Sequence, residues 1–138
     1  MSDPIFGRWL VKSERAVIEF APCAENATRA CGRIVWMAAP RAEDGALKRD
    51  AVNPDPALRD RPICGLRIVS GLKRANVGEW VRGEIYDALR GARFDVEARI
   101  VGPRKLKVRG YVLVGLFGRS QVWTRPTKPE HLQGGCDA

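Results

Sequence analysis

The sequence predicts an all-β protein, an eight-stranded antiparallel up-and-down barrel. Three observations carry this prediction. Apolar and charged residues alternate along two arms between Ala92 and Leu113, separated by Gly102-Pro103. Because successive side chains of a strand point to opposite faces, this alternation indicates a hairpin with one buried and one solvated face. Short segments of similar pattern recur along the chain, and helical periodicity is almost absent.

Six further strands are expected outside this hairpin. They are residues 5–11, 15–20, 32–38, 65–70, 79–87 and 117–125. Residues 21–30 and 71–78 are interpreted as polar connections. The inward face of 79–87 is ambiguous between Trp80/Tyr86 and Val81/Ile85, and the inward face of 117–125 is undecided. A sandwich is the alternative architecture, but closure into a barrel removes the exposed sheet edges. Such a barrel can enclose one small ligand.

The periodicity stops in one long irregular connection, residues 39–63, which is rich in proline and in charges of both signs. Asn53 and Asp55 each precede a proline and are therefore held out of the helical region. Pro56 is expected to open a short helical turn, capped by Asp55. The side chains expected to anchor this connection over one barrel end are Asn53, Asp55, Arg59 and Arg61.

The same polar cluster, with Asp50 and Asp60, is also the best candidate for a catalytic site. However, the chain shows no nucleophile–base pair, no phosphate-binding loop and no metal-ligand spacing. We therefore expect no enzymatic activity, no cofactor and no metal. The single histidine, His131, is assigned no role.

Length and composition are those of one globular domain, expected at residues 4–125 and followed by a polar, disordered tail at 126–138. No apolar run approaches the ~20 residues that a membrane-spanning helix needs. The net charge is +8, and residues 104–125 contain six basic and no acidic residues. A solvated outer face of two strands is the preferred interpretation. Binding of nucleic acid or another polyanion is the alternative, although stacking platforms need several exposed aromatic rings.

Four cysteines occur, at positions 23, 31, 64 and 136. Cys23 and Cys31 flank a short segment between two expected strands, where cross-hairpin distances suit a disulfide. That bond would imply an oxidising compartment. Buried free thiols are the competing interpretation, and both stay open on the sequence alone.

Several ordered motifs together resemble domain-of-unknown-function family 2147, a family of bacterial proteins usually made with a secretory leader. They are Gly7-Arg8-Trp9, Cys31-Gly32-Arg33-Ile34-Val35, Asp50 with Asn53-Pro54-Asp55-Pro56, Leu58-Arg59-Asp60-Arg61-Pro62, Cys64-Gly65-Leu66, Gly83-Glu84-Ile85-Tyr86-Asp87, and the stretches Leu106–Tyr111 and Gly118–Arg125. The resemblance covers about residues 4–125. Two departures are the absence of a leader and Ala88 after Asp87, where the family often has proline.

The resemblance implies a lipocalin-like barrel and export, so a periplasmic or secreted location is expected, with the cytoplasm as alternative. It also implies that Trp9 packs under the closed barrel end against an arginine from a late strand, Arg119 or Arg125, by cation–π stacking. In an exported protein a Cys23–Cys31 bridge is reasonable.

The preferred functional hypothesis is a barrel that binds a small apolar or amphipathic ligand. The expected lining residues are those of inward parity: Phe20, Ile34, Trp36, Ile68, Phe94, Val96, Ile100 and Val108. The alternatives are a filled core acting through protein–protein contacts and a basic barrel that binds a polyanion.

Overall fold

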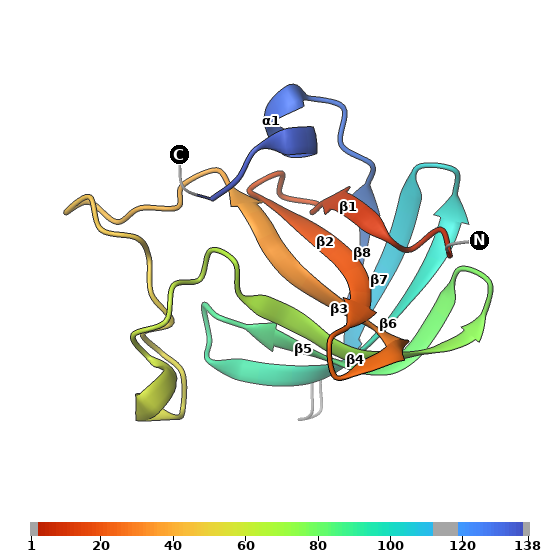
Figure 1. The fold of residues 1–138 in the computed structure, drawn as a ribbon, viewed down its shortest axis with the longest axis horizontal. Helices are drawn as coiled ribbons and strands as arrows, with labels where there is room; N and C mark the ends of the chain where they lie inside the picture. Colours follow the sequence, from red (N-terminus) through yellow and green to blue (C-terminus); the bar gives the residue numbers. More distant parts are fainter. Residues whose placement is uncertain (1–2, 112–118, 137–138) are drawn as a thin grey trace.

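Eight antiparallel strands close into a barrel in which each strand pairs with the next and β1 pairs with β8 (Figure 1). The structure is a computed structural model and describes residues 3–111 and 119–136. The strands are β1 (Gly7–Leu10), β2 (Ala16–Cys23), β3 (Asn26–Met37), β4 (Arg67–Asn76), β5 (Glu79–Asp87), β6 (Ala92–Gly102), β7 (Lys105–Tyr111) and β8 (Arg119–Thr124). The predicted fold class is therefore confirmed.

The hairpin between Ala92 and Leu113 forms β6 and β7 as predicted, within the described residues. Ala98 lies opposite Val108 and both are buried, whereas Glu97 lies opposite Arg109 on the outer face. β8 continues the same buried row, because its Trp123 is buried and lies opposite the buried Leu106. Alternation between a buried and a solvated face thus fixes the register of three neighbouring strands.

The two segments interpreted as polar connections are instead the ends of hairpins. β2 extends to Cys23 and β3 begins at Asn26, while β4 continues to Asn76, so that two residues separate it from β5. Ala30 pairs with Leu72, and both are completely buried. Large apolar residues are rare in these two segments because most side chains of a hairpin end are solvated, and this hides the strand pattern in the sequence.

The ambiguity in β5 has a structural cause, a register shift between Trp80 and Gly83. Arg82 has φ 59° at this irregularity. Before it, Trp80 points inward and pairs with the buried Ala98; after it, Ile85 pairs with Phe94. A bulge of this kind changes the face on which the following side chains lie. The inward residues of β5 are therefore Trp80 from the first expected pattern and Ile85 from the second.

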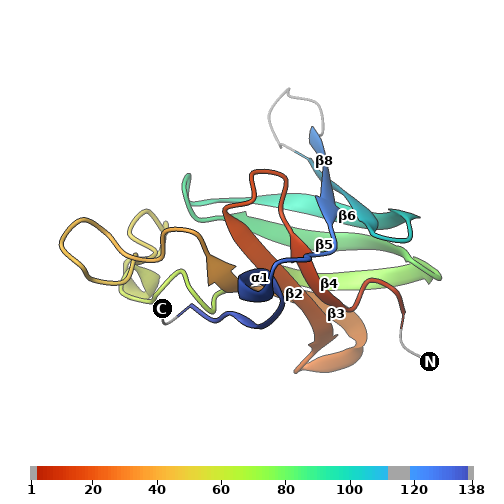
Figure 2. The same ribbon diagram turned by 90° about the horizontal axis from the view of Figure 1, so that it is seen from above.

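Residues 126–136 pack against the barrel, whereas a disordered tail is expected at 126–138. These residues include the short helix α1 (Pro129–Gln133), which lies outside the barrel near β1 (Figures 1 and 2). Its His131 is buried against Trp36, with ring centroids 4.5 Å apart. Arg8 donates to the carbonyl of Gly134 at 2.9 Å, and Cys136 forms a disulfide with Cys64. Contacts with residues far away in the sequence, which local composition does not reveal, order this segment.

Within the described residues, no helix is long and apolar enough to cross a membrane.

The long connection contains the expected helical turn, η1 (Pro56–Leu58). Asp55 caps it by accepting a hydrogen bond from the backbone of Ala57 at 2.9 Å.

Candidate ligand-binding cavity

One end of the barrel is closed by a tryptophan and an arginine. Trp9 is completely buried and donates from Nε1 to the carbonyl of Ile5 at 2.8 Å. The guanidinium carbon of Arg125 lies 3.7 Å from the centroid of the Trp9 ring. Arg125 also donates to the carbonyls of Arg8 at 3.0 Å and Phe6 at 3.1 Å. The contact expected between Trp9 and Arg125 is present, whereas the side chain of the other candidate, Arg119, lies outside the described part of the chain.

Asp3 attaches the N-terminal segment to the β4–β5 turn at the same end. Its carboxylate accepts hydrogen bonds from the backbone of Gly78 at 2.9 Å, from Trp80 Nε1 at 3.0 Å and from Arg74 Nε at 3.1 Å. Burial alone would raise the pKa of Asp3, but these donors together hold it below its ordinary value. The carboxylate is therefore ionised at neutral pH and holds the chain across the barrel end.

Arg125→Lys is expected to lower the free energy of unfolding by about 1–2 kcal/mol, because lysine keeps the charge but not the planar stacking or the fork of donors. Urea denaturation followed by tryptophan fluorescence measures this change. Arg104→Lys, at an exposed arginine of the same barrel end, is the control and is expected to change stability by less than about 0.5 kcal/mol. Equal stability of the two variants would contradict the closing role of Arg125.

Much of the barrel interior is packed with side chains. The core cluster includes Trp9, Ile18, Leu72, Trp80 and Leu106, all nearly or completely buried. Three expected lining residues, Phe20, Ile34 and Val96, belong to this cluster, and Ile100 packs against it. These four side chains fill the barrel, and none of them lines the cavity at its other end.

The other end contains a cavity of about 320 Å³. It is lined by Ile85, Tyr86, Asp87, Arg90, Phe94, Val108, Gly110, Gln121 and Trp123. Phe94 and Val108 are therefore the expected lining residues that do reach a cavity. Trp123 and Gln121 were missed because the inward face of the last strand was undecided. Pairing of Val108 with Gln121 and of Leu106 with Trp123 places both on the inner row.

Two other expected lining residues lie away from this cavity. Trp36 faces α1 outside the barrel, because the β2–β3 pairing shifts register between Val17 and Ile18. Ile68 is half-buried and lies beside a register shift in the β3–β4 pairing. The next residue, Val69, is the one that is fully buried. Strict alternation from the sequence gives the wrong face for Trp36, whereas Ile68 packs against the core cluster without reaching the cavity.

Polar groups are confined to the rim and one wall of the cavity. Asp87 and Arg90 approach each other to 3.7 Å in the β5–β6 turn. Gln121 accepts a hydrogen bond from Trp123 Nε1 at 3.1 Å, which leaves the amide nitrogen of Gln121 as a donor for another group. The remaining walls are apolar.

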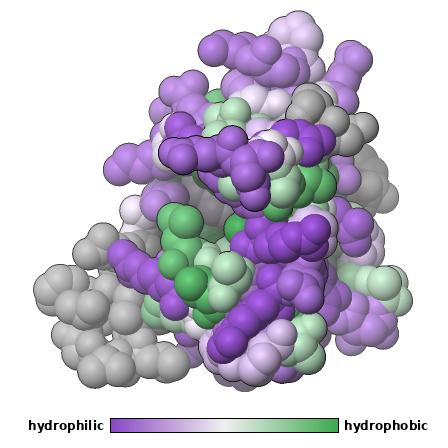
Figure 3. Space-filling view, turned by 90° about the vertical axis from the view of Figure 1, so that its left-hand side faces the viewer, coloured by the Kyte–Doolittle hydropathy of each residue, from purple (hydrophilic) through white to green (hydrophobic). Residues whose placement is uncertain are grey.

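An exposed apolar area adjoins this rim. Leu89, next to Arg90 in the β5–β6 turn, is 89% exposed, and Val52 in the long connection is 51% exposed. Both line a shallow groove between the turn and the connection. Figure 3 views the molecule from this side and shows apolar side chains bordered by hydrophilic ones. The rim of the cavity is thus next to apolar surface.

The long connection is held by a buried polar cluster centred on Asp50. Asp50 is completely buried and accepts hydrogen bonds from Tyr86 OH at 2.5 Å, Asn53 Nδ2 at 2.8 Å and Arg61 Nε at 2.9 Å. Arg59 donates to the carbonyl of Asn53 at 2.8 Å. The four expected anchor residues Asn53, Asp55, Arg59 and Arg61 all make hydrogen bonds within the connection or to its buried carboxylate.

The pKa shifts in this cluster favour an ionised Asp50 and a neutral Tyr86, as expected for a structural anchor. Burial would raise the pKa of Asp50, but the hydrogen bonds from Tyr86, Asn53 and Arg61 together lower it. Burial and then the Asp50 carboxylate raise the pKa of Tyr86. A phenol held neutral against an ionised carboxylate donates a permanent hydrogen bond and is a poor nucleophile.

The four cysteines form two disulfides, Cys23–Cys31 and Cys64–Cys136. In the part of the chain that the structure describes, one group has the spacing of a metal site, Cys23, Glu25 and Cys31. Its two sulfur atoms are bonded to each other at 2.05 Å, so neither is a thiolate that could bind a metal.

A closed eight-stranded up-and-down barrel with a tryptophan–arginine closed end and a cavity at the other end is lipocalin-like in architecture. The chain belongs to the family described as "Uncharacterized protein conserved in bacteria (DUF2147)", whose profile matches residues 7–125. Among solved structures it is similar to protein HP1028 from the human pathogen Helicobacter pylori, described as belonging to the lipocalin family. The TM-score is 0.74 at 20% identity, over 94% of this chain and 87% of that one. No curated protein matches the chain.

Proposed function

We propose that this protein is a non-enzymatic barrel that binds a small apolar or amphipathic molecule in the cavity at its open end. The observation that carries the proposal is a cavity with apolar walls and a polar rim, which the packed core leaves at one end of the barrel. A barrel selected only for a filled core would have side chains that fill this end as well.

The size and lining of the cavity limit the ligand. About 320 Å³ is at the lower end of the range for small-molecule sites, so the ligand or its buried part is small. Ile85, Phe94, Val108 and Trp123 offer contacts to an apolar moiety. Asp87, Arg90 and the Gln121 amide suit a polar group at the entrance. An amphipathic molecule would bind with its apolar end inward.

Cavity filling tests ligand binding directly. Gly110 lies on the cavity wall, and a Cβ added there would approach no atom closer than 3.9 Å. Gly110→Leu is therefore expected to fold and to weaken binding of the fluorescent apolar probe N-phenyl-1-naphthylamine roughly tenfold or more, since it occupies the volume of several ligand atoms. Titration of the probe and quenching of tryptophan fluorescence measure the affinity.

Gly102→Leu is the matched control. It makes the same substitution at the end of β6 that lies away from the cavity, where an added Cβ also meets only ordinary contacts, the nearest at 3.7 Å. Its probe affinity is expected to equal that of the parent protein. Failure of the parent protein to bind the probe, or equal weakening in both variants, would refute the cavity as the site and favour a role through protein–protein contacts.

We also infer an oxidising compartment, the periplasm or the exterior of the cell, from the two disulfides and the bacterial family. Alkylation of thiols in intact cells, followed by mass measurement, tests this inference. We expect no alkylation, because all four cysteines are disulfide-bonded. Alkylation of all four cysteines would contradict an oxidising compartment.

A further inference from the structure

The whole net charge of the chain resides in one stretch. Residues 99–129 contain eight basic residues and no acidic one, whereas the rest of the chain has 16 of each sign. The basic residues are Arg99, Arg104, Lys105, Lys107, Arg109, Arg119, Arg125 and Lys128. The stretch comprises the end of β6, then β7 and β8 with the residues that follow, so the charge lies on one side of the barrel.

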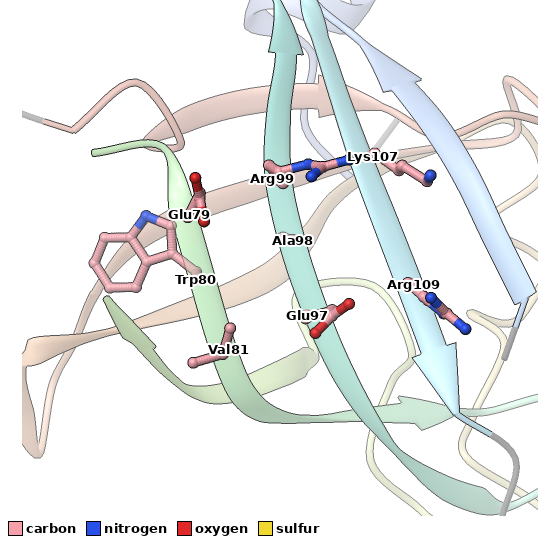
Figure 4. Close-up of a pocket in the computed structure, with 8 residues that line it drawn as sticks. All are labelled: Glu79, Trp80, Val81, Glu97, Ala98, Arg99, Lys107 and Arg109. Atoms are coloured by element: carbon pink, nitrogen blue, oxygen red, sulfur yellow. The ribbon is translucent and has the colours of Figure 1, made fainter. Parts of the chain in front are cut away.

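Four of these side chains define the basic face: Arg99, Arg104, Lys105 and Lys107. Arg99 lies opposite Lys107 on the outer face of the β6–β7 pair, and Figure 4 shows Arg99 extending toward Lys107. Lys105 follows one row further toward the β6–β7 turn, which carries Arg104. None of the four takes part in an ion pair with a described residue, although Glu79 lies across from Arg99 on β5.

Aliphatic side chains are exposed within the same face. Val122 of β8 lies opposite Lys107 of β7 and is 41% exposed. Val101, beside the β6–β7 turn, is 44% exposed. The described part of this face exposes no aromatic side chain on which a nucleic-acid base could stack, since Trp80, which lines the adjoining hollow, is buried. Cationic groups around exposed aliphatic groups match the interface of an anionic bilayer, where phosphates meet acyl chains.

We propose that the basic face docks the barrel onto anionic phospholipid membranes. Arg99, Arg104, Lys105 and Lys107 contact headgroup phosphates, and Val101 and Val122 enter the interface between them. Glu79 and Glu97 line the hollow on β5–β7 shown in Figure 4 together with Arg99 and Lys107, and the two carboxylates form the border of the face on the β5 side. The proposal is independent of ligand binding in the cavity, which lies at the other end of β6.

The test is flotation of the full chain with vesicles of phosphatidylcholine, with or without phosphatidylglycerol. The protein is expected to bind only the anionic vesicles and to be released by high salt. Lys107→Glu is expected to reduce binding at least about tenfold, because each basic residue near the surface contributes several-fold in affinity. The new carboxylate lies opposite Arg99, so the variant is expected to stay folded.

Lys73→Glu is the matched control. It makes the same charge change opposite Arg29 on the β3–β4 pair, in the part of the chain whose charges cancel. Its vesicle binding is expected to fall less than twofold. Equal loss in the two variants would show that only net charge acts and would overturn a defined face. Binding to oligonucleotides but not to anionic vesicles would overturn the membrane as partner.

Discussion

Replacing Cys64 and Cys136 together by serine is expected to lower the free energy of unfolding by about 4 kcal/mol. The disulfide joins residues 72 positions apart, and the entropy that a crosslink removes from the unfolded chain grows with the length of the closed loop. It also ties α1 to the barrel, where His131 covers Trp36. Urea denaturation of the parent and double variant, followed by far-UV circular dichroism, measures the difference.

Cys23 and Cys31 provide the matched control, because this second bridge closes a separation of only 8 residues. The corresponding double serine variant is expected to lose roughly 2.5 kcal/mol. A larger loss from the short bridge than from the long one would mean that local strain or packing, and not loop closure, determines the contribution of each bond.

The barrel could be predicted from the sequence because most of its strands have one buried and one solvated face. β6 and β7 show this most clearly: Val96 and Ala98 alternate with Asp95, Glu97 and Arg99. The Trp9–Arg125 contact could be predicted only from the family resemblance, because no local sequence pattern relates two residues 116 positions apart.

Register irregularities and distant contacts could not be predicted. Val17 and Ile18 are successive residues of β2, yet both are buried, because Ile18 belongs to the core while Val17 pairs with Trp36 on the outer face near α1. The sequence gives no sign that a polar tail covers this face. Nor does it show which cysteine pairs with Cys136. These facts depend on the closed barrel bringing Cys64 and the C-terminal segment together.

Asp50→Ala is expected to lower the free energy of unfolding by about 3 kcal/mol or more. The carboxylate is completely buried and accepts hydrogen bonds from Tyr86, Asn53 and Arg61, so its removal leaves several donors without a partner inside the protein. Tyr86→Phe removes one donor only and is expected to cost about 1–2 kcal/mol. Thermal and urea denaturation of both variants measure the two changes.

The charge of Asp50 predicts a pH dependence with a definite sign. The pKa of Asp50 in the folded protein is below its ordinary value of 3.8, so the unfolded chain takes up a proton first as the pH falls. The stabilisation by the carboxylate is therefore complete above about pH 4 and is lost as the pH falls through the lower, folded-state pKa.

The isosteric variant Asp50→Asn separates charge from shape, because its amide keeps the size of the carboxylate but does not ionise. The parent protein is expected to exceed this variant in unfolding free energy at pH 7, and the gap is expected to narrow below about pH 4. The measurement is a series of urea denaturations of both proteins from neutral to acidic pH. A gap that stayed constant would mean that Asp50 stabilises the connection through packing and hydrogen-bond geometry, with no contribution from its ionisation.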